Sequence, residues 1–137
     1  MTTIVGCSKS KVSTETPVAA KHLYDSPYFN KRWTVASHDD DHVLILSAKH
    51  GIVDPDTKLL PYDVSMYDLS ADERRAMAHD IDTEEWDDTV VVYAGTLYVD
   101  VIRDACGSRH TVVSPLSGGL GEQLSQLNTR ISEIEEN

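Results

Sequence analysis

The residues best suited to chemistry gather in short polar clusters. These clusters are Cys7-Ser8-Lys9-Ser10-Lys11, then Ser47-Ala48-Lys49-His50-Gly51 followed by Leu60-Pro61-Tyr62-Asp63, then Gly95-Thr96-Leu97-Tyr98, and finally Pro115-Leu116-Ser117-Gly118-Gly119-Leu120-Gly121-Glu122-Gln123. Hydroxyls, ammonium groups and glycine-rich backbone of this kind bind a phosphate or stabilise a carbonyl oxygen that develops negative charge. The clusters therefore predict a site for a polar ligand.

Four residues are the catalytic candidates: Lys49, His50, Cys7 and Lys11. Lys49 and His50 together supply a fixed cation and a group that titrates near neutrality. Cys7 has two interpretations. Nearby lysines would lower the pKa of its thiol and make it a nucleophile, or the thiol is buried and inert.

The other candidates would contact the substrate. They are Ser8, Lys9, Tyr24, Ser26, Tyr28, Ser47, Tyr62, Gly95, Tyr98, Gly119 and Gln123. A tyrosine that faces the site offers a surface on which a base stacks, although the same rings serve equally as core aromatics. The glycines near residue 119 let backbone approach a ligand, or simply form a turn before a helix.

Several common sites are excluded by spacing. The chain has no Gly-x-x-x-x-Gly-Lys-Ser/Thr loop, no His-Glu-x-x-His and no Gly-x-Ser-x-Gly. Its six histidines lack the paired spacing of metal ligands. We therefore predict neither a metal nor a cofactor.

The polar clusters each follow a short apolar run. The runs are Thr2–Gly6, Val43–Ser47, Thr89–Ala94 and His110–Ser114. They are continuous rather than alternating, which is typical of strands covered on both faces in a parallel sheet. Ligands of open α/β sheets bind beyond the carboxyl ends of the strands, where the strand order reverses. We therefore expect the clusters to meet at one edge of a sheet.

Helical segments separate the strands. The expected helices cover Pro17–Tyr24, Pro27 through Ala36, the segment from the Ser70 cap to His79, Thr96–Ala105 and Gly121–Glu135. This alternation predicts one α/β domain over residues 1–137. Its architecture is a three-layer sandwich around a mostly parallel central sheet of about four strands. Residues 48–69 are expected to be one long irregular stretch.

The charge is strongly negative and unevenly distributed. The formal net charge is −11, and all six lysines lie in residues 1–58. Such a chain repels polyanions, but molar salt shortens the Debye length to about 3 Å. The acidity therefore predicts a protein from a high-salt cytoplasm, as in halophilic archaea, and leaves the retained lysines as the informative charges.

The compartment is predicted from what the sequence lacks. It has no apolar run of the roughly 18 residues that a membrane helix needs and no secretion signal at its start. Two cysteines make no disulfide framework. We expect a cytoplasmic protein with reduced thiols and no membrane partner.

The same clusters carry a resemblance over most of the chain. The matching motifs are Val5–Lys11, Ala20–Phe29, Leu46–Gly51, Leu60–Asp63, Ala94–Tyr98 and Gly121–Gln123. They resemble an uncharacterised family of archaea, bacteria and phages that is related to the YaaA-like proteins, a group linked to oxidative DNA stress.

A shorter motif, Cys7-Ser8-x-x-Lys11, is similar to one in the uracil-DNA-glycosylase-like domain of archaeosine synthase, a tRNA-modifying enzyme. This resemblance implies a uracil-DNA-glycosylase-like fold. The chain departs from that motif, since Val12-Ser13 replaces Pro-Tyr and the later Ser-x-Ser-His is absent.

Two functions are open at this point. One is an enzyme that acts on a nucleobase or nucleotide in DNA or RNA, by glycosidic-bond cleavage or base modification. The other is a non-catalytic nucleotide or nucleic-acid binding module. A chain this short has little surface for a nucleic acid, so a homo-oligomer, a protein partner or a free nucleoside substrate is also expected. A third interpretation is that the polar loops only stabilise the fold.

Overall fold

Short, largely buried strands form the centre of the protein. The structure is a computed structural model that describes residues 1–8, 11–40 and 42–136. β1 (Thr2–Gly6) is buried along its whole length, and β3 (Val43–Ser47) and β6 (Thr89–Tyr93) pair with it in parallel on either side. β7 (Thr111–Val113) extends the parallel part beside β6. All four strands lie where the apolar runs predicted them.

A fifth strand makes the sheet mixed. The order is β4-β3-β1-β6-β7, and β4 (Gly51–Val53) runs antiparallel to β3. Residues 48–50 form the connecting turn, and Gly51 at its end has a φ of +74°, which glycine adopts without steric cost. The expected mostly parallel sheet of about four strands is thus corrected to a mixed sheet of five.

The segment expected to be irregular, residues 48–69, is largely ordered. Besides β4 it contains β5 (Lys58–Leu59) and a 3-10 turn, η1 (Met66–Asp68). Side-chain and backbone hydrogen bonds between Ser65 and Asp68 hold η1 in a capping box. These elements are too short for sequence periodicity to predict.

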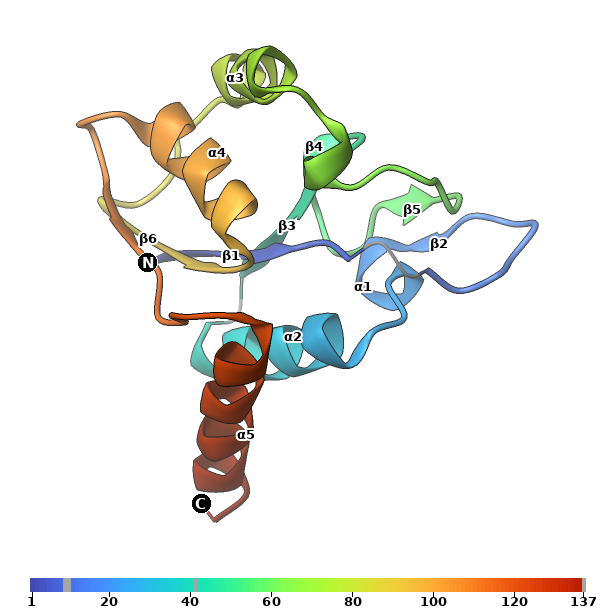
Figure 1. Ribbon diagram of the computed structural model, residues 1–137, viewed down its shortest axis with the longest axis vertical. Coiled ribbons are helices and arrows are strands. Elements are labelled where there is room, and N and C mark those ends of the chain that lie inside the picture. The colour runs from blue at the N-terminus through green and yellow to red at the C-terminus, as the bar shows by residue number, and fades with distance from the viewer. Residues whose placement is uncertain (9–10, 41, 137) are drawn as a thin grey trace.

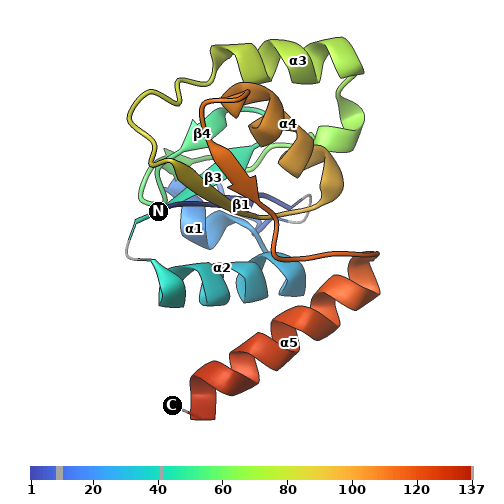
Figure 2. The ribbon, with the colours of Figure 1, turned by 90° about the vertical axis from the view of Figure 1, so that its left-hand side faces the viewer.

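Helices cover both faces of the sheet, so the protein has the three layers that the sequence predicts (Figure 2). α2 (Pro27–Asp39) and α5 (Leu120–Glu136) lie on one side, and α3 (Ala71–Asp80) and α4 (Thr96–Cys106) lie on the other. The predicted cap is present, since Ser70 forms a capping box with Glu73, and Ser26 Oγ accepts the N–H of Phe29 at the start of α2.

The helix expected over Pro17–Tyr24 is mostly wrong. Only α1 (Ala20–Leu23) is helical, and β2 (Val18–Ala19) instead pairs antiparallel with β5. Carbonyls of the 54–59 segment accept the N–H groups of Ala20 and Lys21, so tertiary contacts replace the expected first helical turn. This small sheet projects beyond the carboxyl end of β1 (Figure 1).

Within the described part of the chain, no helix has both the length and the apolar character that crossing a membrane requires.

Candidate functional site

A cavity of about 360 Å³ lies where the strand order of the sheet reverses. The chain leaves β1 for β3 on one side of it and later reaches β6 on the other side. The crevice between the ends of such strands is the usual ligand position in open α/β sheets. We name it the switch-point cavity. Its lining residues are Cys7, Ser8, Ser26, Tyr28, Arg32, Ser65, Tyr67, Gly95, Tyr98 and Leu120.

Six of these residues are among those the sequence selected: Cys7, Ser8, Ser26, Tyr28, Gly95 and Tyr98. They come from the end of β1, the start of α2, and the β6–α4 junction. The sheet therefore brings three clusters that are distant in sequence to one place.

Cys7 follows β1 directly and is held by a neighbouring tyrosine. Its Sγ lies 3.4 Å from the hydroxyl oxygen of Tyr98, and that oxygen also accepts the N–H of Met66 at 3.3 Å. Burial raises the pKa of Tyr98, so this hydroxyl stays protonated at neutral pH. Because its oxygen already accepts a hydrogen bond, its proton remains available to the sulfur.

A chain of three hydroxyls lies beside the cavity. The Tyr62 oxygen is 2.6 Å from both Tyr24 Oη and Ser47 Oγ, and Ser47 Oγ accepts the N–H groups of Lys49 and His50. With both acceptor positions of Ser47 occupied, its proton points to Tyr62, whose proton then points to Tyr24. This hydroxyl chain thus has one direction and leaves the Tyr24 proton for a further acceptor.

Cys7 links the hydroxyl chain to the cavity. Burial raises the pKa of Tyr24 to about 12, and proximity to Cys7 adds to the increase. The pKa of Tyr62 is raised by the same two causes in the same order. Both tyrosines therefore act as hydrogen-bond donors near neutral pH, not as general bases.

Three candidate cations and bases surround the Tyr62 ring. The Lys11 ammonium lies 4.2 Å from the ring centroid, the Lys49 ammonium lies 6.0 Å from it, and the His50 ring meets it edge-on at 5.4 Å. Partial burial and, after it, the Lys49 charge lower the pKa of His50. The imidazole is therefore mainly neutral at pH 7 and can accept a proton.

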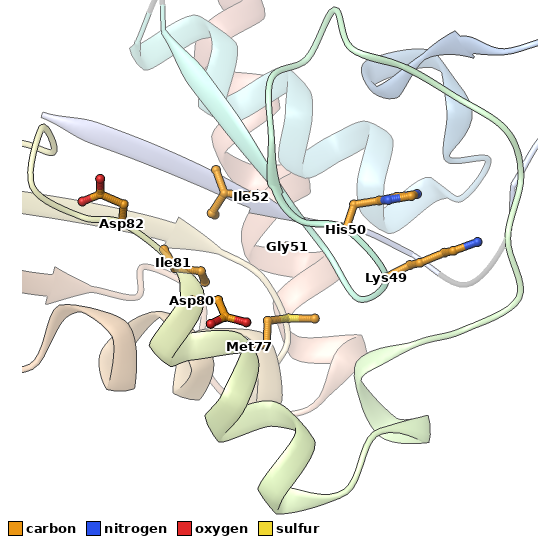
Figure 3. Close-up of a pocket in the computed structure, with 8 residues that line it drawn as sticks. All are labelled: Lys49, His50, Gly51, Ile52, Met77, Asp80, Ile81 and Asp82. Atoms are coloured by element: carbon orange, nitrogen blue, oxygen red, sulfur yellow. The ribbon is translucent and has the colours of Figure 1, made fainter.

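A second cavity, of about 410 Å³, is lined in part by Lys49 and His50. Figure 3 shows that the ends of both side chains point away from Met77 and Asp80 on its other wall. They extend toward Tyr62 instead, so the Lys49 ammonium and the His50 imidazole point away from this cavity. The predicted pair therefore belongs to the hydroxyl chain and does not line the switch-point cavity.

Two predicted residues, Gly119 and Gln123, are not brought to either group. Gly119 is exposed, and a Cβ added there would meet nothing within 4 Å, while Lys9 lies outside the described residues. Gln123 is buried on α5, where its amide donates to the Gly118 carbonyl at 3.2 Å while Oε1 has no partner. Among the described residues, no three His, Cys, Asp or Glu side chains converge as metal ligands.

Replacing Tyr62 by phenylalanine should cost about 1–3 kcal/mol of stability. The substitution removes the central hydroxyl and leaves the Ser47 proton without its acceptor. Urea unfolding measures the loss. Tyr67→Phe is the matched control, because that side chain is 69% exposed, and it should change little. Equal stability of the two variants would contradict the directed hydroxyl chain.

Comparison with known proteins places the chain in a family. A family model described as "Family of unknown function (DUF6884)" matches residues 2–129. The chain belongs to this family. It is also 32% identical over 148 residues to the uncharacterized protein YfjM of Bacillus subtilis (strain 168), a match covering 97% of the chain and 96% of that relative. No solved structure matches the chain.

The family match spans every described residue that lines the switch-point cavity. It confirms the expectation of membership in a family of unknown function. It does not test the relation to the YaaA-like proteins or the similarity to the glycosylase-like motif of archaeosine synthase. Both resemblances stay predictions.

Sequence analysis missed four lining residues of this family member: Arg32, Ser65, Tyr67 and Leu120. One of them had a visible signature. Arg32 is the only arginine in residues 1–58, and it follows Tyr28 by four residues, which places both on the same face of a helix. Leu120 lies inside the glycine-rich cluster but is not among the candidates, because it is apolar. Ser65 and Tyr67 lie outside the clusters, and only tertiary structure brings them to the cavity.

Proposed function

We propose that the protein acts on a nucleobase carried by a nucleotide or a nucleic acid, by cleaving the glycosidic bond or by modifying the base. The observation that carries this proposal is the switch-point cavity, which combines aromatic rings, hydroxyls and a cysteine at the reversal of strand order. A volume of about 360 Å³ falls in the usual range of small-molecule sites, about 300–1,000 Å³.

The cavity lining suits recognition of a flat, polar ring. Tyr28 and Tyr67 offer faces on which a base stacks, and such stacking tolerates any base. Ser8, Ser26 and Ser65 place hydroxyl groups around the same space. Ser26 Oγ accepts the Phe29 N–H and keeps its proton to donate, whereas Ser65 Oγ donates to Asp68 and can still accept. Together they can meet a carbonyl and an amino group at the edge of a base.

The chemistry in this proposal depends on groups that stay protonated. In glycosidic-bond cleavage, water bonds to the sugar carbon, the carbon–nitrogen bond breaks, and the base leaves with a proton. Water supplies that proton, and Tyr98, whose hydroxyl stays protonated, can turn its hydrogen bond from the Cys7 sulfur to the departing base. Lys49 and His50 contact Tyr62 and serve as positioning residues for the hydroxyl chain.

A non-catalytic nucleotide-binding module is the second candidate, and one observation favours it. The described residues that line the cavity include no carboxylate, the group that most glycoside-cleaving sites use as acid or base. Recognition without turnover needs the rings and hydroxyls alone.

The two candidates separate in one experiment. We expect the protein to release a base or change its mass when it is incubated with nucleosides, nucleotides and short DNA or RNA oligonucleotides, at low and molar salt. Mass spectrometry detects either product. Cys7→Ser and Tyr98→Phe should each lower the rate about 100-fold or more, since they remove the sulfur or the hydrogen-bond donor.

Lys31→Met is the control, because Lys31 hydrogen-bonds Asn128 away from the cavity lining. Binding without any product would favour the module. Neither binding nor product across the panel would contradict both candidates.

A further inference from the structure

Arg32 is a buried cation in the wall of the switch-point cavity. Its side chain is 5% exposed, and it lies on α2 one turn after Tyr28, which lines the same cavity. The neighbouring apolar residues Phe29, Val35 and Ala36 face the core. The Arg32 side chain therefore faces the cavity and not the solvent.

No acidic side chain among the described residues neutralises this arginine. Among the side chains described in residues 1–8, 11–40 and 42–135, no carboxylate forms an ion pair with it, and its buried Nε has no hydrogen-bond acceptor. The guanidinium carbon lies over the Tyr28 ring, 5.8 Å from the ring centroid. Burial lowers the pKa of Arg32, but a guanidinium remains charged in proteins.

A buried charge without a partner destabilises a protein, so the ligand-free cavity contains a positive charge that an anionic ligand would compensate. The surroundings add further positive character, because the amino-terminal end of α4 begins at Gly95 in the cavity wall. The hydroxyls of Ser26 and Ser65 lie in the same wall. An anion would complete this site, and a planar guanidinium binds phosphate through two parallel hydrogen bonds.

The rim of the cavity is suited to a flat ring of the ligand. Tyr67 and Leu120 are 69% and 55% exposed, and both belong to the small set of large apolar side chains that the described surface leaves open. A ligand that carries an anion at one end and a flat ring at the other would cover both. The net charge of −11 repels a long polyanion, whereas a small anion can still enter a local positive site.

We infer that Arg32 anchors the phosphate of a nucleoside monophosphate, with the base lying toward Tyr67 at the rim. This inference rests on the proposed function and narrows its substrate from nucleobases in general to mononucleotides. It also assigns the buried arginine a role as a binding residue that costs stability in the ligand-free protein.

The test measures stability and affinity together. Wild-type protein, Arg32→Met, Arg32→Lys and the control Lys31→Met are titrated with the four nucleoside 5′-monophosphates, their nucleosides, inorganic phosphate and a short oligonucleotide. Thermal shift reports stability and calorimetry reports affinity. Wild type and Lys31→Met should bind a monophosphate, and the nucleoside should bind about 10- to 100-fold more weakly.

Arg32→Met should lose the same factor toward the monophosphate, while its ligand-free form melts at the wild-type temperature or above it. Arg32→Lys should recover part of the affinity, because a lysine keeps the charge and loses the planar fork. A lower melting temperature for Arg32→Met together with unchanged nucleotide affinity would show that the arginine is structural, and would overturn the inference.

The remaining outcomes separate this inference from the proposed function. Equal affinity of wild type for nucleoside and monophosphate would overturn the anchor and leave the nucleobase proposal standing. Arg32-dependent binding of inorganic phosphate with no added affinity from any base would keep the anion site and contradict the nucleobase proposal. Tighter binding of the oligonucleotide than of every monophosphate would overturn the choice of mononucleotides.

Discussion

Gly6→Ala should destabilise the protein by about 1–3 kcal/mol and weaken ligand binding in the switch-point cavity. A Cβ added at Gly6 would lie 2.7 Å from the Cβ of Ala94 and 3.3 Å from the Tyr98 ring. Ala94 has no flexible side chain that could move aside, so the end of β1 and the start of the β6–α4 junction must separate. That shift displaces Tyr98, which holds Cys7.

Denaturant unfolding and ligand titration measure the two effects of Gly6→Ala. The matched control is Gly121→Ala within α5, where an added Cβ would meet nothing within 4 Å. This control should be neutral, or more stable by up to about 1 kcal/mol, because alanine favours a helix. A Gly6→Ala variant as stable as the control would refute the close packing of β1 against α4.

Phe29→Ala should lose about 3–5 kcal/mol of stability, the largest loss we expect from a single truncation. Phe29 is completely buried on α2, and its ring lies 4.9 Å from that of Tyr24 and 6.3 Å from that of Trp33. Removing it leaves a void directly behind the aromatic residues of the site. Tyr24 would then lose the surface that holds its hydroxyl against Tyr62.

Thermal and urea unfolding check the loss, and Phe29→Leu controls for ring volume. The leucine variant should lose clearly less, because it fills most of the void. Similar values for the two substitutions would show that Phe29 contributes little through packing. Near-wild-type stability of Phe29→Ala would contradict its place in the core.

The sequence predicts the fold well where periodicity is long and the caps are local. The four parallel strands and α2 to α5 follow from apolar runs, from Pro27 at a helix start and from the Ser70 cap, although β7 is partly exposed and not covered on both faces. β4 and β2 could not be predicted in this way. β4 depends on the backbone conformation of Gly51, and β2 depends on its pairing with β5, which lies far along the chain.

The site residues also divide into those that the sequence predicts and those that it does not. Residues next to strand ends, such as Cys7 and Gly95, reach the cavity because the topology of the sheet fixes the positions of those ends. Arg32 reaches it from the second turn of a helix, and an arginine there is usually a solvated surface residue. Its spacing from Tyr28 is visible in the sequence, but its burial with no acceptor for Nε among the described residues is a three-dimensional property.

The placement of α5 has a consequence for local unfolding. Its first residue, Leu120, lines the cavity, and its middle part contacts α2, where an ion pair joins Arg130 and Asp39 at 2.8 Å. Its last residues run away from α2 (Figure 2). Amide hydrogen exchange follows such opening segment by segment. Occupancy of the cavity would slow exchange at the beginning of this helix and leave the fraying of its far end unchanged. One helix thus contains both the reporter amides and their internal reference.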